Sequence, residues 1–221
     1  MQSDNISISA IVPVRAGSKR VVDKNIRPFA ETTLLELKID QLLAVSRIDR
    51  VYVSSDSDSM LAIASSKGCI PLKRPSEFAS DTIPMSDVYA HLASVMEGDT
   101  VLFTHVTNPL CASEKYSEAI DKYATRAPIY DSVTTVSEVK DFLYLNGKAM
   151  NFDPQNKPRS QDLPAIVKLN HAISIAPRDC MIQNRNIFGK NPLFVKIDEL
   201  SAFDVDNVLE FEIAEYLYLK S

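Results

Sequence analysis

Apolar and polar positions follow two different periods along the first 137 residues of the chain. Short continuous apolar or β-branched runs predict buried strands, and runs with apolar residues three and four apart predict amphipathic helices. The expected strands are residues 9–14, 50–56, 69–72, 100–106 and 131–137, and the expected helices are residues 34–43, 57–68, 87–97 and 112–124. This alternation is typical of βαβ units. We therefore expect an α/β fold with a mostly parallel sheet and helices on both faces.

The stretch from about residue 138 to residue 168 departs from this pattern. It is polar, contains three prolines, and includes an Asn-Gly pair within YLNGKAM that favours a tight hairpin turn. We interpret it as an excursion from the sheet that forms either a lid or a dimer arm. After it, residues 171–176 predict a strand and residues 205–220 a terminal helix. We expect one domain over residues 1–221, with this arm inserted.

Residues at helix ends refine these boundaries. Gly68 follows the second helix at the position where a left-handed residue commonly ends a helix. Ser86 precedes the third helix and is a candidate N-cap, because its hydroxyl can accept from a free backbone N–H. Asp206 is a candidate N-cap of the terminal helix for the same reason.

Composition narrows the class of protein. The chain has 221 residues, 45% of them hydrophobic, which is enough for a sizeable core. Apolar runs are too short for a membrane span, and the start MQSDNISISAIVPV lacks the basic region of a signal peptide. Three widely spaced cysteines argue against a disulfide framework and against a zinc site. We expect a protein of the reduced cytoplasm that binds neither membrane nor nucleic acid, since its net charge is −5.

The charge is unevenly distributed. Between Arg15 and Arg27 there are five basic residues and one acid, a local charge of +4, so the remainder carries −5 − 4 = −9. Because this loop follows the first strand, it falls where parallel sheets bind ligands. Lys and Arg side chains, with backbone N–H groups near Gly17, suit the oxygens of a polyphosphate. The alternative is a solvated basic loop that balances the acidic remainder, and charge alone favours neither interpretation.

Two carboxylates near the C-terminus form a second candidate site. Asp204 and Asp206 are two residues apart, so an extended segment would place both on one face. Such a pair suits Mg²⁺, which prefers few protein oxygens together with water and phosphate. From the residues alone, a helix cap at Asp206 with a surface charge at Asp204 is an equal alternative.

The sequence PVRAGSKRVVDKNIRPF resembles the opening motif of the CMP-sugar synthetases, which activate sialic-acid-like ulosonic acids. The matching positions are Arg15, Gly17, Ser18, Lys19, Lys24 and Asn25. The chain departs from the family at Arg20, where the family commonly has glycine.

The resemblance extends over nearly the whole chain in six motifs. IDRVYVSSD resembles the family's second strand, and KRPSEFASDT resembles a segment that places Arg74, Asp81 and Thr82. VTNPLCAS, PRSQDLP, LNHAISI and FDVDNVLEFEIAE follow in the family's order. In the LNHAISI motif, His171 and Ser174 depart from a glycine and a tyrosine of the family.

The resemblance implies a Rossmann-like nucleotidyltransferase fold and the reaction of CTP with a 2-keto sugar acid to give a CMP-sugar and pyrophosphate. It implies catalytic roles for Arg15, Lys19 and Lys24, and nucleotide binding by Arg15, Ala16, Gly17, Ser18, Lys19, Asn25, Arg74, Thr82 and Ser86. It implies sugar binding by His105, Thr107, Asn108, Arg159 and Asn170, with Mg²⁺ held by Asp204 and Asp206. The departing His171 and Ser174 would also line the acceptor site.

The substrates implied are CTP and a nonulosonic acid, most simply N-acetylneuraminic acid. The resemblance also implies a homodimer, in which an arm of the partner subunit completes the sugar site. Two alternatives stay open. One is a synthetase for the eight-carbon acid Kdo, although the family's Kdo branch has an Asp after the third strand where this chain reads THVTNPL. The other is a non-catalytic sensor of nucleotide sugars.

Overall fold

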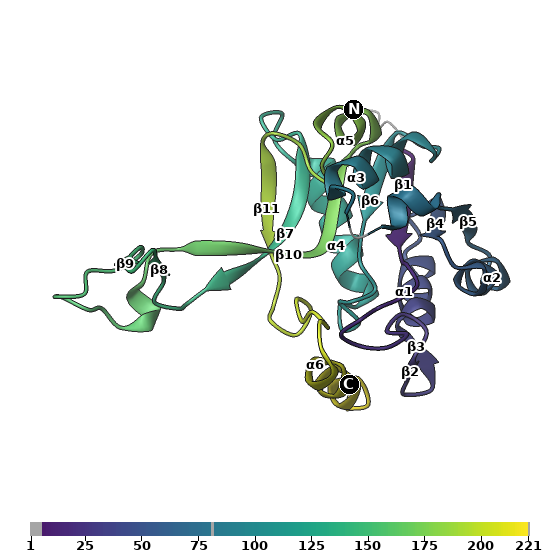
Figure 1. The fold of residues 1–221 in the computed structure, drawn as a ribbon. Coiled ribbons are helices and arrows are strands. Elements are labelled where there is room, and N and C mark those ends of the chain that lie inside the picture. The colour runs from purple at the N-terminus through teal and green to yellow at the C-terminus, as the bar shows by residue number, and fades with distance from the viewer. Residues whose placement is uncertain (1–5, 81, 221) are drawn as a thin grey trace.

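The computed structural model describes residues 6–80 and 82–220, which form a central sheet flanked by helices with one long arm (Figure 1). The strands are β1 (Ile8–Pro13), β2 (Pro28–Phe29), β3 (Thr32–Thr33), β4 (Arg50–Ser55), β5 (Ile70–Lys73), β6 (Thr100–Phe103), β7 (Ser132–Val139), β8 (Tyr144–Leu145), β9 (Lys148–Ala149), β10 (Ile166–Pro177) and β11 (Pro192–Lys196). The α-helices are α1 (Leu34–Leu43), α2 (Asp58–Ser66), α3 (Met85–Ser94), α4 (Ser113–Thr125), α5 (Arg178–Asn184) and α6 (Val208–Tyr218), and the 3₁₀ helices are η1 (Ser76–Ala79) and η2 (Ser160–Asp162). The predicted α/β class is confirmed.

Seven strands make the central sheet in the order β11-β7-β10-β6-β1-β4-β5. Strand β1 pairs in parallel with both β4 and β6, β4 pairs in parallel with β5, and β11 pairs in parallel with β7. Only β10 among these strands runs against its neighbours β6 and β7. The expectation of a mostly parallel sheet is therefore confirmed, and the carboxyl ends of β1, β4 and β6 meet at one edge.

Apolar side chains fill both faces of the sheet. On one face, α1, α2, α4 and α6 pack over a large cluster that includes Leu34, Ile39, Ile120 and Phe211. On the other face, α3 and α5 cover a smaller cluster around Leu92. The helices therefore hold the sheet from both sides, as the βαβ pattern predicts. No described helix is long and apolar enough to cross a membrane.

Side-chain caps begin three of the helices. Thr33 Oγ1 accepts from Glu36 N at the start of α1, and Ser57 accepts from Met60 N at the start of α2. Asn207 begins α6. Gly68 follows α2 with φ of +81°, which confirms the predicted left-handed helix end.

Two predicted caps are wrong. Ser86 lies inside α3, because Pro84 precedes a helix that begins at Met85 and makes no side-chain cap. Asp206 is one residue too early, since Asn207 and Glu210 form a reciprocal capping box at α6. Because Asn207 is the cap, the Asp206 carboxylate lies outside the helix and is available for other contacts.

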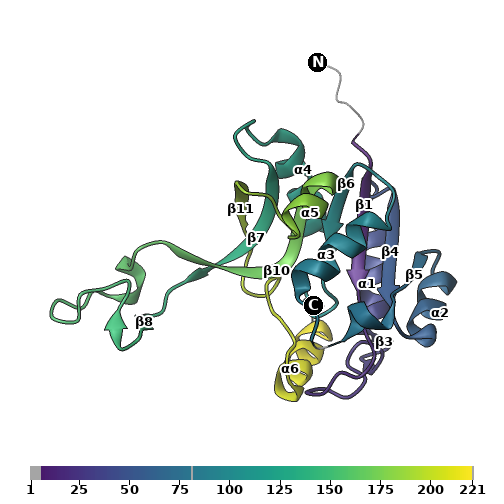
Figure 2. The ribbon, with the colours of Figure 1, turned by 45° about the horizontal axis from the view of Figure 1, so that its top comes forward.

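The arm lies between β7 and β10, at residues 140–165, slightly shorter than the expected 138–168 because both strands continue into it. It projects away from the sheet in both views (Figures 1 and 2). At its tip, β8 and β9 form the predicted hairpin, with Asn146 and Gly147 at φ of +51° and +78°. These angles are those of a tight Asn-Gly turn. A T-shaped pair of Phe142 and Phe152, with ring centroids 4.8 Å apart, supports the hairpin from below.

Candidate active site

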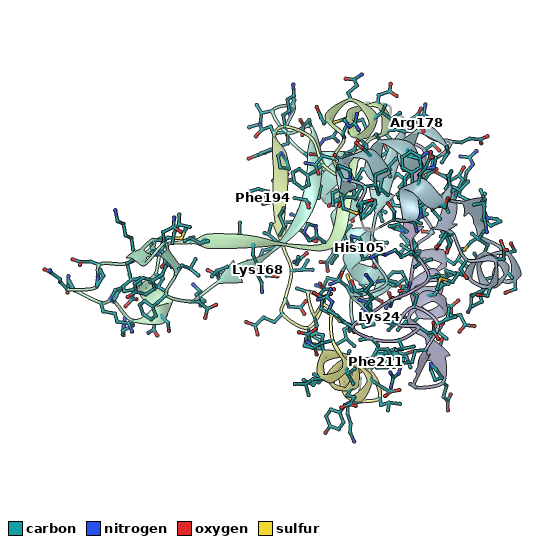
Figure 3. The ribbon with its side chains drawn as sticks, viewed as in Figure 1. Lys24, His105, Lys168, Arg178, Phe194 and Phe211 are labelled. Carbon is teal, nitrogen blue, oxygen red and sulfur yellow. The ribbon has the colours of Figure 1, made fainter. Side chains whose placement is uncertain are left out.

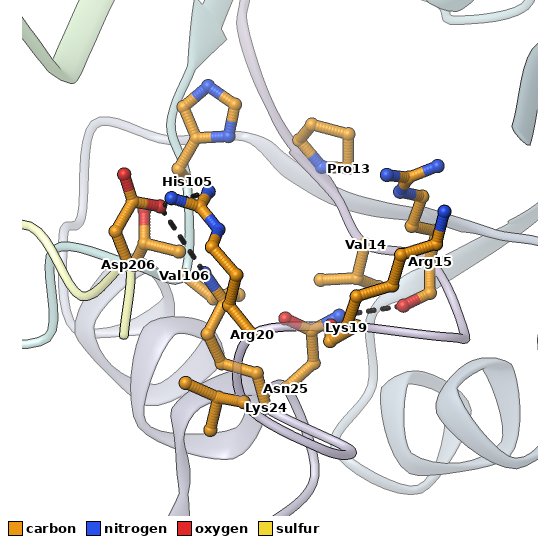
Figure 4. Close-up of a pocket in the computed structure, with 13 residues that line it drawn as sticks. Pro13, Val14, Arg15, Lys19, Arg20, Lys24, Asn25, His105, Val106 and Asp206 are labelled. Atoms are coloured by element: carbon orange, nitrogen blue, oxygen red, sulfur yellow. Dashed lines mark hydrogen bonds and ion pairs between the residues drawn. The ribbon is translucent and has the colours of Figure 1, made fainter. Parts of the chain in front are cut away.

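A cavity of about 470 Å³ opens at the carboxyl ends of β1 and β6 (Figure 4). The loop after β1 supplies Arg15, Ser18, Lys19, Arg20, Lys24 and Asn25, and the segment after β6 supplies His105, Val106 and Thr107. Asp206 closes the side nearest α6. The basic loop therefore reaches the ligand-binding edge of the sheet that its position in the sequence predicts.

Hydrogen bonds across the sheet edge hold the basic loop in shape. The backbone N–H of Ala16 donates to Asp56 Oδ1 at 3.0 Å, which ties the loop to the end of β4. Asn25 is buried, and its Nδ2 donates to the Arg15 carbonyl at 2.9 Å (Figure 4). Gly17 has φ of +73°, a conformation that other residues adopt only with strain. The loop thus presents its backbone and its cations from a fixed frame.

Two cations of the loop, Arg20 and Lys24, lie near one carboxylate. Arg20 Nη2 lies 2.8 Å from Asp206 Oδ1, and Lys24 Nζ lies 3.9 Å from the same atom. Lys24 also donates to the Val205 carbonyl at 2.7 Å. Burial lowers the pKa of Lys24, while the nearby Asp206 and Asp204 oppose that shift. With four basic side chains and one acid in its lining, the cavity attracts anions.

A second cavity, of about 520 Å³, meets the first at Asp206. It lies between the root of the arm and the segment before α6, and is lined by Ser137, Glu138, Lys140, Asp141, Lys168, Glu199, Ala202, Phe203, Asp204, Asp206 and Glu210. In Figure 3, Lys168 lies on β10 at the root of the arm, while Lys24 and His105 lie nearer the centre. The two cavities therefore offer adjacent places for two ligands.

Asp204 and Asp206 both line the second cavity. Partial removal from water raises the pKa of Asp204, and repulsion from Asp206 adds to the shift, while a hydrogen bond with Thr107 opposes it. No group of three or more His, Cys, Asp or Glu side chains suited to a metal occurs within residues 6–80 and 82–220. A pair of hard oxygen donors at a junction of two polar cavities fits Mg²⁺, which completes its coordination with water and phosphate.

A third, smaller cavity of about 210 Å³ lies beyond Arg15 and is bounded by Arg74, Phe78, Ala79, Ser80, Ile83, Met85 and Val88. Arg74 is buried and donates through Nη2 to the carbonyls of Val14 and Ser54. Its Nε has no hydrogen-bond partner among the described residues. A small cavity lined by five apolar side chains together with Arg15, Arg74 and Ser80 suits a flat polar ring such as a nucleobase.

Two histidine rings lie near each other, and one of them, His105, lines the first cavity. The rings of His105 and His171 have centroids 6.4 Å apart and are nearly perpendicular. Burial lowers the pKa of His105 to about 4, and the nearby side chains of His171, Lys24 and Lys38 add to the shift. His105 is therefore neutral at pH 7 and can act as both donor and acceptor. His171 has φ of +55°, a left-handed conformation, at the irregularity in the β10–β7 pairing.

Of the remaining predicted residues, the structure brings only some to these cavities. Asn108 is buried, and its Nδ2 donates to the carbonyl of Phe203 at 3.2 Å. Asn170 is also buried and bonds the hydroxyls of Thr135 and Ser137. Both amides therefore hold the frame of the site and do not line its cavities. The expectation that Ser174 lines the acceptor site is wrong, because Ser174 is 1% exposed and bonds Thr134.

Three further predicted residues lie outside the cavities described above. Thr82 bonds the hydroxyl of Ser80 at 3.1 Å, and Ser86 lies in the first turn of α3. Arg159 is exposed on the arm and pairs with Asp162 at 2.7 Å. Asp81, which the same motif places beside Thr82, is outside the described residues.

Sequence reasoning missed several residues of the site. Asp56 orients the basic loop, and Arg20 pairs with the candidate metal carboxylate. Lys38 and Tyr116 form a buried polar contact behind the segment that follows β6. Of these, Asp56 and Arg20 carried a usable signal, since Asp56 ends a predicted strand next to the basic loop and Arg20 lies within that loop.

Comparison with known proteins identifies close relatives. Residues 9–192 match the sequence model of the family described as Cytidylyltransferase. Post-translational flagellin modification protein B of Campylobacter coli is 30% identical over 95% of this chain and 94% of its own. The N-acylneuraminate cytidylyltransferase of Escherichia coli O18:K1:H7 is 28% identical over 94% of this chain, which covers 51% of that protein. The pseudaminic acid cytidylyltransferase of Campylobacter jejuni serotype O:2 is 25% identical over 94% of both chains.

Solved structures share the fold at lower identity. A 4-diphosphocytidyl-2C-methyl-D-erythritol synthase from Anaerococcus prevotii superposes with a TM-score of 0.72 at 13% identity, over 99% of this chain and 98% of its own. A CMP:2-keto-3-deoxy-manno-octonic acid synthetase complexed with CTP superposes with a TM-score of 0.71 at 14% identity, over 97% and 99% of the two chains. These likenesses establish the arrangement of sheet and helices.

Proposed function

Because the chain belongs to the cytidylyltransferase family, we propose that it transfers the CMP part of CTP to a sialic-acid-like nonulosonic acid. The observation that carries this proposal is the pair of cavities that meet at Asp206, one lined by cations and the other reaching the root of the arm. The anomeric hydroxyl oxygen of the acid attacks the α-phosphorus, the bond to the β-phosphate breaks, pyrophosphate leaves, and the hydroxyl proton passes to water. CTP and the acid are thus the two substrates.

We propose that the triphosphate binds in the cation-lined cavity. A triphosphate carries about four negative charges, which the side chains of Arg15, Lys19, Arg20 and Lys24 can offset. Charge moves toward the leaving pyrophosphate during the reaction, so donors fixed in place stabilise the transition state more than the ground state. Asn25, which fixes the Arg15 carbonyl, and Gly17 keep the backbone in the required shape. The smaller cavity at Arg74 takes the cytosine.

Asp204 and Asp206 are the residues that would hold Mg²⁺. When bound there, the ion would neutralise phosphate charge and lower the pKa of the attacking hydroxyl. Arg20 pairs with Asp206 at a surface position where ion pairs are weak. We therefore propose that Arg20 moves from Asp206 to a phosphate oxygen when the nucleotide enters.

The second cavity is the proposed seat of the sugar acid, with His105 and Thr107 at its border with the nucleotide. Arg159 lies within the arm, which projects away from the sheet (Figure 1), and it does not line this cavity in its own subunit. We propose a homodimer in which Arg159 of the partner subunit binds the sugar carboxylate, for which its planar fork is well suited. The exposed apolar side chains of Tyr144 and Leu145 on the arm, 60% and 59% exposed, support contact with a second copy.

A panel of four sugar acids, used as acceptor substrates, tests the proposed reaction. Pyrophosphate release is measured with CTP, Mg²⁺ and each of four acids: N-acetylneuraminic, pseudaminic, legionaminic and Kdo. We expect turnover with at least one nine-carbon acid, and, because of His105 and His171, a preference for a modified acid over N-acetylneuraminic acid. Turnover with Kdo alone would move the enzyme to the eight-carbon class. Binding of CMP-sugars without pyrophosphate release from any acid would favour the sensor.

Subunit mixing tests the arm. Arg159→Ala and Lys24→Met subunits are each expected to be nearly inactive, since one lacks the carboxylate fork and the other a phosphate cation. In mixed dimers, the intact nucleotide site of one subunit meets the intact arm of the other, so about a quarter of the parental activity returns at equal amounts. If Arg159 acted within its own subunit, mixing would restore nothing.

We further propose that the enzyme works in the cytoplasm, where CTP is available.

A further inference from the structure

Lys38 is a fully buried lysine that the proposed reaction does not use. It lies on α1 with 0% exposure, and its Nζ donates to the Asn108 carbonyl at 2.9 Å and to the Tyr116 hydroxyl. The ammonium also lies 5.0 Å from the centre of the Tyr116 ring. Among the described residues, no carboxylate forms an ion pair with it. An ammonium without a carboxylate partner is costly to bury, so its contacts must offset a substantial loss of hydration.

The contacts of Lys38 reach the site through one segment. Asn108 ends the stretch after β6 that carries His105 and Thr107 into the first cavity. Whereas the Asn108 carbonyl accepts from Lys38, the Asn108 side chain donates through Nδ2 to the Phe203 carbonyl at 3.2 Å. One residue earlier, the Thr107 carbonyl accepts from Val205 N at 2.8 Å. The segment 104–108 is therefore fixed to Lys38 on one side and to the residues around Asp204 on the other.

Neighbouring contacts strengthen the same connection. Gln41, one turn further along α1, donates to the Pro109 carbonyl at 2.7 Å. The Tyr116 hydroxyl bonds Thr104 at 3.1 Å, and Thr104 donates to the Ala172 carbonyl at 2.7 Å. The face of α1 that carries Lys38 thus holds the start and the end of the segment. Burial lowers the pKa of Lys38 to about 8, so the ammonium is mostly charged at pH 7.

We infer that Lys38 is a positioning residue for nucleotidyl transfer, which holds segment 104–108 and, through it, Asp204 and Asp206 in place opposite the basic loop. The inference rests on the proposed function of that site. A carbonyl and a phenol oxygen are acceptors that a compact cation with several donors can join at once, which a neutral apolar side chain of the same length cannot. Displacement of a site by about 1 Å can lower turnover a hundredfold, so a contact behind the site can govern the rate.

Lys38→Met is the direct test, because it keeps length and apolar character and removes the donors. Hydrogen–deuterium exchange is followed in peptides that cover residues 104–111 and 202–206, which include the Val205 amide. We expect exchange there to accelerate at least tenfold, with kcat reduced at least tenfold and KM for CTP within threefold of the parent. Leu92→Ala, in the cluster on the opposite face of the sheet, is the control for general destabilisation and should change neither.

Tyr116→Phe separates the two contacts of Lys38. It removes the phenol oxygen and keeps the bond to the Asn108 carbonyl, so exchange in residues 202–206 should match the parent. Should Lys38→Met fail to fold, Asn108→Ala cuts the connection one step later, and its exchange in residues 202–206 should accelerate. Parental exchange and parental kcat in Lys38→Met, or parental exchange in Asn108→Ala, would overturn the inference.

The exchange readout does not depend on the substrate. If the parent released no pyrophosphate with any of the four acids, the proposed function would fail, and exchange in Lys38→Met would still decide whether Lys38 holds the segment. Faster exchange with unchanged kcat would assign Lys38 a structural role alone and would also overturn the inference.

Discussion

Lys24→Met tests whether a fixed cation drives pyrophosphate departure. Lys24 Nζ lies 2.7 Å from the Val205 carbonyl and 3.9 Å from Asp206 Oδ1, at the floor of the cation-lined cavity. Methionine has nearly the same length and an apolar stem, so it fills the space of the lysine without its charge or its donors. The substitution therefore separates the electrostatic role of Lys24 from its packing.

The expected effect on folding is small. Two unit charges 3.9 Å apart interact by about 4 kcal/mol at an effective dielectric constant of about 20. Because the Asp206 side chain is 47% exposed and Arg20 also pairs with it, solvent and competition reduce this to about 1 kcal/mol. Loss of the charge also removes the burial penalty that lowers the pKa of Lys24. These contributions oppose each other, so we expect Tm to shift by less than about 4 °C.

The expected effect on turnover is large. A fixed donor aimed at charge that develops in the transition state contributes about 3–4 kcal/mol, so kcat should fall by about 10²–10³. Pyrophosphate release at saturating CTP gives kcat, and a CTP titration gives KM. Lys67→Met is the matched control, because Lys67 pairs with Asp40 at 2.7 Å and does not line the cavities of the site. A kcat within threefold of the parent at unchanged Tm would refute the phosphate role of Lys24.

Four further substitutions test other parts of the site. Asp204→Asn and Asp206→Asn should each raise the Mg²⁺ concentration needed for half-maximal rate and lower the maximal rate, and a change in Tm alone would leave them no metal role. His171→Gly should raise stability by about 1 kcal/mol in thermal unfolding, because φ of +55° strains a residue with a Cβ, and an unchanged or lower Tm would contradict this. The pKa of His105 is lowered to about 4, so the unfolded state alone takes up a proton below pH 6.5 and stability falls as pH drops from 6.5 toward 4. His105→Gln should reduce this fall by about 2–3 kcal/mol in unfolding measured at pH 7 and pH 4.5, and equal losses in both proteins would refute the shift.

The first half of the fold was predictable because its periodicity is strong. Each predicted strand and helix between residues 9 and 137 has a counterpart, from β1 to β7. The missed elements carry weak local patterns. Helix α5 has only seven residues, and β11 is an edge strand of five whose side chains are mostly part-exposed. For such elements, the stabilising contacts come from β7 and α3, which sequence periodicity does not reveal.

The cap errors have a simple physical origin. Several residues near a helix start can accept from a backbone N–H, and the choice among them depends on where the helix actually begins. At α6, the reciprocal bonds of Asn207 and Glu210 are stronger than a single bond from Asp206. At α3, Pro84 fixes the backbone before the helix and makes a side-chain cap at Ser86 unnecessary.

The residues of the candidate site also divide into those that the sequence located and those whose role depends on packing. Charge and motif spacing located the basic loop, Asp204 and Asp206, all of which line the two large cavities. They did not distinguish residues that line a cavity from residues that hold its walls. Asn108 and Asn170 belong to the second kind, since Asn108 Nδ2 donates to a carbonyl and the Asn170 amide bonds two hydroxyls inside the protein. Such a role depends on which face of a loop is buried, which only the packed structure decides.

The contacts of the basic loop bear on both of its interpretations. From the sequence, the loop could bind phosphate or could balance the charge of the acidic C-terminal segment. The structure brings the loop and the acidic segment into contact. Arg20 pairs with Asp206, and Ala30 N donates to Glu215 Oε1 at 2.6 Å. The Glu215 contact lies away from the cavities, whereas the Arg20 side chain is 68% exposed and lines one of them. An exposed ion pair contributes little to stability. The same loop thus contains both the charge that pairs with the acidic segment and the cations of the cavity that we propose for the triphosphate.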